Sequence, residues 1–235
     1  MTVRRTTGTP SGAAIFGPDF FPFLRGLAKN NDRQWFEANK SRYRDHVQAP
    51  ALEFVRRVGP QLERISPHLI ADPRPVGGSV MRIYRDIRFS KDKSPYKTAV
   101  GIRFMVVPSG ADDAYAPGFF LRLAPGDSWT YAGIWQIQGP ALDHVRKAIV
   151  DRTEEWRKVR AAVPEVEGES LRRAPTGFDP AHPFIEDIKR KGFSAGLEVK
   201  DSEVTRPEFP DRFVAACRTL DPLNRFLSSA LGVEY

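Results

Sequence analysis

Six cationic side chains and two aspartates crowd into the sixteen residues 82–97, RIYRDIRFSKDKSPYK. Arginine guanidinium groups grip phosphate or carboxylate through paired hydrogen bonds, and cations on one loop can converge within about 10 Å, the range of charge screening at moderate salt. We therefore predict a basic pocket for an anionic ligand, either a phosphorylated small molecule or nucleic acid. Its binding residues are expected to be Arg82, Arg85, Arg88, Lys93, Tyr96 and Lys97.

The same segment also has a purely structural interpretation. Asp86 and Asp92 can pair with neighbouring bases and hold a hairpin in shape, and exposed ion pairs of this kind contribute about 0 to 1 kcal/mol. Strand parity favours binding, because Arg82, Arg103 and Arg122 fall at polar positions of three expected strands. A row of like charges on one sheet face must meet solvent, a ligand or acidic side chains, and the N-terminal helices offer such acids.

An enzyme could use the same cleft, with Arg85 and Arg88 holding the substrate and Asp86 or His182 as the catalytic group. A carboxylate among guanidinium groups keeps a low pKa, so Asp86 suits orientation better than proton transfer near neutral pH. His182 precedes an expected helix start, where N–H groups favour anions, although a histidine that fixes the turn is the simpler interpretation. The sequence leaves open whether a reaction is catalysed, and a non-catalytic scaffold is a third alternative.

Other catalytic and cofactor motifs are absent from the sequence. It contains no phosphate-binding loop, dinucleotide glycine fingerprint, nucleophile elbow or zinc signature, so we expect no metal and no cofactor. The single cysteine, Cys217, fits a buried helix position better than the role of a nucleophile.

The whole chain is basic, with 235 residues, a net charge of +7 and a pI of 9.7. This balance favours acidic partners such as phosphates or nucleic acid. No apolar run reaches the roughly eighteen residues that span a bilayer, so no membrane partner is expected. The lone cysteine and the lack of a secretory signal favour a cytoplasmic location, and nothing in the sequence indicates an oligomeric state.

Hydrophobic periodicity predicts an α+β fold, in which an antiparallel sheet of about four or more strands packs with N-terminal and C-terminal helices. Residues 1–17 are expected to form a flexible tail and residues 18–235 a single domain. Asn31 is the expected N-cap of the second helix, and Asp221-Pro222 should separate two closing helices. Alternating residues predict strands at 79–85, 99–105, 118–124 and 129–137, with a further short strand near 197–199.

Aromatic residues interleave with the bases of the predicted sheet. This arrangement is typical of stacking platforms for single-stranded nucleic acid, but a place in the core is the simpler interpretation for the tryptophans. The residues concerned are Tyr84, Phe89, Tyr96, Trp129, Tyr131 and Trp135.

Four ordered stretches of the chain resemble a bacterial and fungal family known as domain of unknown function 2461. They are NNDRQWFEANKSRY at 30–43, the basic segment 82–97, PGFFLRLAPGDSWTYAGIW at 117–135 and LRRAPTGFDPAHPFIEDIKRKGF at 171–193. The resemblance runs from about residue 20 to 231. The chain departs from it at WQIQGP, where the proline after Trp135, the tryptophan that closes the expected fourth strand, is delayed to Pro140. The family carries no assigned activity, so the resemblance implies a grouping and leaves the chemistry open.

Overall fold

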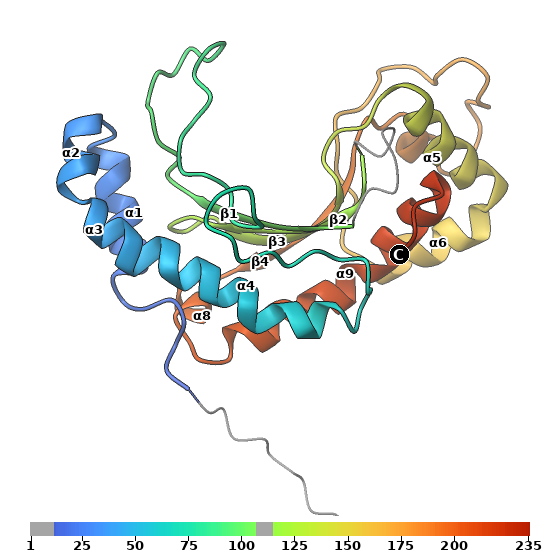
Figure 1. Ribbon diagram of the computed structural model, residues 1–235. Coiled ribbons are helices and arrows are strands. Elements are labelled where there is room, and N and C mark those ends of the chain that lie inside the picture. Colours follow the sequence, from blue (N-terminus) through green and yellow to red (C-terminus); the bar gives the residue numbers. More distant parts are fainter. Residues whose placement is uncertain (1–11, 107–114) are drawn as a thin grey trace, which may run out of the picture.

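The computed structural model describes residues 12–106 and 115–235, and Figure 1 shows a sheet with helices beneath it and at both sides. Residues 1–11 of the expected tail lie outside the described residues. Phe16 belongs to the same predicted segment, yet it is completely buried and its ring lies 4.7 Å from that of Phe20. The ordered core therefore includes residues before Pro18.

Four antiparallel strands form the sheet in the order β1-β2-β3-β4, which confirms the predicted α+β class. In each of the first three strands, buried positions largely alternate with half-buried or exposed ones, because one sheet face packs on helices and the other does not. The strands are β1 (Val100–Met105), β2 (Gly118–Leu123), β3 (Ser128–Ile134) and β4 (Phe193–Val199).

The predicted strand at 79–85 is wrong. Only Val80 bridges to Ile102 beside β1, and the chain then leaves the sheet. The fourth strand is instead β4, which extends the predicted 197–199 segment back to Phe193 and pairs with β3 along its whole length. Alternation alone could not separate a strand from a short edge contact, because both place apolar residues at every second position.

The N-terminal helices lie beside and beneath the sheet. Asp32, and not the predicted Asn31, caps the second helix, because its carboxylate accepts a hydrogen bond of 2.8 Å from the N–H of Trp35. Pro60 lies inside the last helix of this group without ending it. The elements are α1 (Phe20–Lys29), α2 (Arg33–Ala38), α3 (Lys40–Tyr43), the π-helix η1 (Arg44–Gln48) and α4 (Ala49–Leu62).

The C-terminal region ends in one long helix where two were predicted. Helix α9 continues through Pro222, because its burial against β3, β4, α4, α5 and α6 offsets the cost of a proline, about 3 kcal/mol. Two shorter helices meet at Arg152, which ends α5 and precedes α6. The elements are α5 (Gly139–Asp151), α6 (Thr153–Ala162), α7 (Ile185–Ile188), α8 (Asp201–Val204) and α9 (Phe209–Leu231).

Helices α4 and α9 cover one face of the sheet and leave the opposite face open (Figure 1). Phenylalanine rings fill the covered side, where Phe54 lies 5.4 Å from Phe209 and 5.2 Å from Phe213. Cys217 is completely buried on α9, as predicted. Among the described residues no helix is long and apolar enough to cross a membrane.

Candidate functional site

Residues 82–97 form an arm that rises from the edge of the sheet beside β1 (Figure 1). Its two sides are joined by backbone hydrogen bonds, from Lys97 N–H to Ile83 C=O at 2.8 Å and from Arg85 N–H to Pro95 C=O at 2.9 Å. The predicted basic segment is therefore a short hairpin-like projection whose base adjoins the open sheet face.

The side chain of Asn31 fixes the base of the arm. Its amide donates to the Tyr96 carbonyl at 2.9 Å and accepts from the Tyr96 N–H at 3.0 Å, so one side chain replaces a neighbouring strand. The Tyr96 ring is buried and stacks on Phe36, with the ring centres 4.1 Å apart. Burial also raises the pKa of the Tyr96 hydroxyl above its usual value. Tyr96 thus acts mainly as an anchor for the arm.

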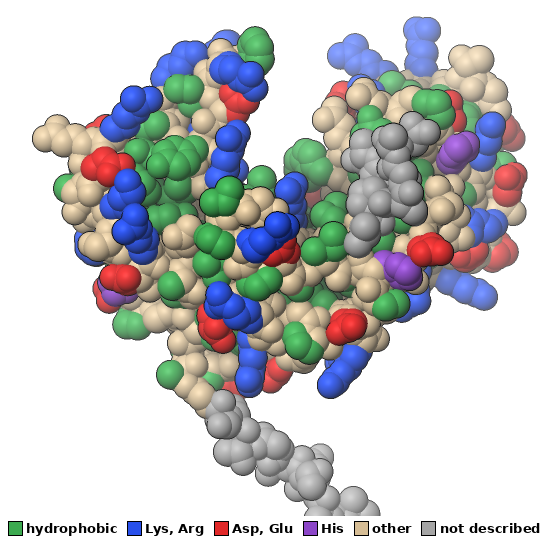
Figure 2. Space-filling view, viewed as in Figure 1, with side chains coloured by type: hydrophobic (Ala, Val, Ile, Leu, Met, Phe, Trp, Pro, Cys, Tyr) green, Lys and Arg blue, Asp and Glu red, His purple; other side chains and the backbone are tan. Residues whose placement is uncertain are grey.

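A cleft lies between the arm and the open sheet face, and Figure 2 shows the hollow from the side. It consists of two adjoining cavities of about 750 and 730 Å³, which share Met81, Phe120 and Arg122 in their walls. Arg85 and Lys97 contribute from the arm. Each cavity falls in the range of about 300 to 1,000 Å³ that small-molecule sites occupy.

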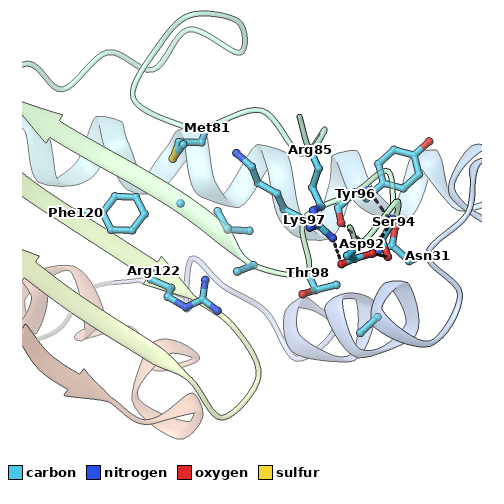
Figure 3. Close-up of a pocket in the computed structure, with 14 residues that line it drawn as sticks. Asn31, Met81, Arg85, Asp92, Ser94, Tyr96, Lys97, Thr98, Phe120 and Arg122 are labelled. Atoms are coloured by element: carbon cyan, nitrogen blue, oxygen red, sulfur yellow. Dashed lines mark hydrogen bonds and ion pairs between the residues drawn. The ribbon is translucent and has the colours of Figure 1, made fainter. Parts of the chain in front are cut away.

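Three cations at this cleft have no carboxylate partner in the part of the chain that the structure describes. Lys97 and Arg103 line the cavities, and Arg82 lies close enough to Lys97 to influence its charge. Burial first, and then the charges of Arg82 and Arg103, lower the pKa of the Lys97 ammonium. In Figure 3 the side chains of Lys97 and Arg122 project into the space between the arm and the sheet.

The other predicted bases of the arm are engaged within the arm. Arg85 pairs with Asp92, as Figure 3 shows, and Arg88 pairs with Asp86 at 2.6 Å. Hydrogen bonds from these arginines lower the pKa of both carboxyl groups. The ammonium of Lys93 donates to a backbone carbonyl at 3.0 Å. The two interpretations of the segment thus apply to different residues: part of the charge is paired and part is not.

His182 lies apart from the arm. Its Nδ1 accepts a hydrogen bond of 3.1 Å from the Phe184 N–H, and its Nε2 lies 3.2 Å from the hydroxyl of Thr153 at the start of α6. These are the contacts expected of a histidine that fixes a turn. Neither His182 nor Asp86 lines a cavity of the cleft, so the structure places neither predicted catalytic group in its walls.

The open sheet face holds functional candidates that the predicted site did not include. Arg103, Phe120 and Tyr131 form one row across β1, β2 and β3, and Arg122 lies opposite Trp129 in the next row. Arg122 pairs with Asp127 at 2.8 Å, and this contact lowers the pKa of the aspartate. Two glycines within the strands are the sequence signal for this face, because the rings of Phe120 and Tyr131 occupy the space beside them: Gly101 and Gly196.

The expected core position is wrong for two tryptophans of the sheet region. Trp129 is half-buried on the open face, where it stacks on Tyr131 with an angle of 18° between the ring planes. Trp135 is 78% exposed and lines the cleft. The alternation of β3 places position 129 on the uncovered side, and a tryptophan there has no helix to pack against.

These features define an α+β protein with one helix-covered sheet face and one open, basic and aromatic face. The chain belongs to the family described as conserved hypothetical protein (DUF2461), whose model matches residues 19–226. This result confirms the family resemblance of the four sequence stretches. Comparisons with curated proteins and with solved structures find no significant match.

Proposed function

We propose that the cleft binds a phosphorylated or otherwise anionic ligand. The observation that supports this best is the gathering of Arg82, Lys97 and Arg103, none of which forms an ion pair with a carboxylate among the described residues. Like charges held close together, here the half-buried Lys97 and the exposed Arg82 and Arg103, cost free energy, and a bound anion would offset that cost. Burial is the main cause of the lowered pKa of Lys97, and the charges of Arg82 and Arg103 lower it further.

The ion pairs of the nearby acids explain why the proposal concerns these three cations and not the other arginines. Asp86, Asp92 and Asp127 each form an ion pair with an arginine outside the cluster, and of the three only Asp86 lies close enough to Arg82 for that charge to lower its pKa. Their lowered pKa values also keep them ionised near neutral pH, where a carboxylate of this kind is a poor proton donor or acceptor. Binding is therefore a better conclusion for this cleft than acid–base catalysis.

The six arm residues proposed as ligand contacts take unequal roles. Lys97 lines the cavity, Arg82 lies beside Lys97 outside the cavity walls, Arg85 lines the cavity while it holds Asp92, and Tyr96 keeps the arm in place. Arg88 and Lys93 lie outside the cavity walls and contribute only to the surrounding positive field. Arg103 and Arg122 complete the set from the sheet.

Inorganic tripolyphosphate tests the proposal, because it carries charge without any other recognition feature. At a hundredfold excess over its Kd it should stabilise the protein by about 2.7 kcal/mol and raise the Tm by roughly 5–10 °C. Arg103→Gln should weaken binding about tenfold. Arg57→Gln is the matched control, since Arg57 is also exposed but lies on α4, beneath the opposite sheet face. Equal affinities of the two variants, or no Tm shift in the wild type, would refute the proposal.

A further inference from the structure

Aromatic rings lie flat against the open face of the sheet next to the unpaired cations. A methyl group added at Gly196 would lie 2.6 Å from the Tyr131 ring and 3.2 Å from the Trp129 ring. At Gly101 it would lie 3.0 Å from the ring of Phe120. The rings therefore occupy the space that a side chain at these glycines would fill.

Phe120 and Tyr131 are half-buried and line the cleft, so part of each ring is accessible from it, while Trp129 stacks on Tyr131 outside the cavity walls. Phe120 lies directly opposite Tyr131 in the strand pairing, so the aromatic surface extends over two neighbouring strands. Flat aromatic surface beside arginines is suited to a ligand that has both planar rings and negative charge.

We infer that the ligand of the cleft is single-stranded nucleic acid, whose bases stack on Phe120 and Tyr131 while its phosphates meet the unpaired cations. This inference rests on the proposed function and specifies its ligand class. In a duplex the flat faces of the bases are covered by the neighbouring base pairs, so aromatic side chains of this kind can stack only on the bases of single strands. The pI of 9.7 agrees with binding to an acidic partner such as nucleic acid.

The extent of the site favours a strand over one nucleotide. The two adjoining cavities together exceed the space that a single small ligand needs, and they share Phe120 and Arg122 at their junction. A chain of several nucleotides can place one phosphate at the arm and successive bases along the rings. Trp135, 78% exposed at the far wall, offers a further stacking surface.

The first experiment compares three ligands on the wild-type protein by competition against a fluorescein-labelled twelve-residue oligothymidylate. Unlabelled oligothymidylate should compete at least about fivefold better than an abasic oligodeoxyribose phosphate of equal length, because stacking is lost in the latter. Thymidine monophosphate should compete far more weakly than either. Competition by the monophosphate as strong as that of the oligomer would overturn the single-strand inference in favour of a nucleotide ligand.

The second experiment uses variants of the aromatic surface. Tyr131→Leu and Gly196→Ala should each weaken oligothymidylate binding at least about fivefold and leave tripolyphosphate binding unchanged. Gly196→Ala keeps the Tyr131 side chain but displaces its ring. Matched controls are Phe178→Leu, a half-buried aromatic outside the cleft, and Gly17→Ala, where an added methyl group meets nothing.

The outcomes separate the two proposals. Equal binding of abasic and normal oligomers, with tripolyphosphate still bound through Arg103, overturns only the nucleic-acid inference. If the wild-type protein binds neither the oligomers nor tripolyphosphate, the proposed anion site is overturned as well. Circular dichroism and the Tm of each variant show whether a loss of binding comes from unfolding, and the wild-type comparison of ligands stands without any variant.

Discussion

Replacing Asn31 by alanine should release the arm that carries Lys97. The variant loses two hydrogen bonds to the Tyr96 backbone, of 2.9 and 3.0 Å, and each such bond contributes about 1 kcal/mol net. The expected loss of unfolding free energy is therefore about 2 kcal/mol. For a chain of this size this corresponds to a Tm lower by roughly 4–8 °C. Asn31 lies between α1 and α2, so no helix propensity complicates the comparison.

Hydrogen exchange measured by mass spectrometry should locate the change. Peptides from 82–97 should exchange faster in Asn31→Ala, because their amides at Arg85 and Lys97 bond only within the arm. Asn30→Ala is the control: Asn30 is the neighbouring asparagine, and its exposed side chain makes one hydrogen bond, to the Gly26 carbonyl. Equal Tm values and equal exchange in the two variants would show that the Asn31 contact does not hold the arm.

The remaining predictions concern ionisation. Anion binding should raise the lowered pKa of Lys97, because the anion stabilises the charged ammonium. The affinity for tripolyphosphate should therefore fall as the pH rises through that lowered value toward 10.5. The variant Lys97→Arg stays charged and should lack this part of the pH dependence in a titration calorimetry series. Asp187→Ala should cost about 3–5 kcal/mol in urea unfolding, because this carboxylate is buried and pairs with two arginines, whereas Glu186→Ala, whose acid is exposed, should cost less than about 1 kcal/mol. A similar loss in both variants would contradict the assigned burial effect.

Much of the fold follows from local patterns, and its errors have specific physical causes. Strand alternation located β1, β2 and β3, but at 79–85 it could not show that the chain leaves the sheet after one bridge. Pro222 was expected to end a helix because a proline inside a helix costs free energy in any sequence context. The packing that offsets this cost comes from elements far away in the sequence.

The candidate site was also predictable only where local patterns determine it. Strand parity correctly placed Arg103 and Arg122 on one sheet face, because their spacing within the strands sets the side on which they lie. Local pairing of Arg85 with Asp92 and of Arg88 with Asp86 depends on how the arm bends, which parity does not specify. The contact between Asn31 and Tyr96 joins residues 65 positions apart and had no local signal.

The separation of the two sheet faces has a consequence for how such a protein can change. Side chains toward α4 and α9 are packed and tolerate little alteration, whereas those on the open side touch mainly one another. Substitutions at Phe120, Tyr131 or Arg103 should therefore alter selectivity while most of the folding energy is preserved. Members of the family could diversify what they recognise on an unchanged scaffold, and designers could randomise the same positions in a library.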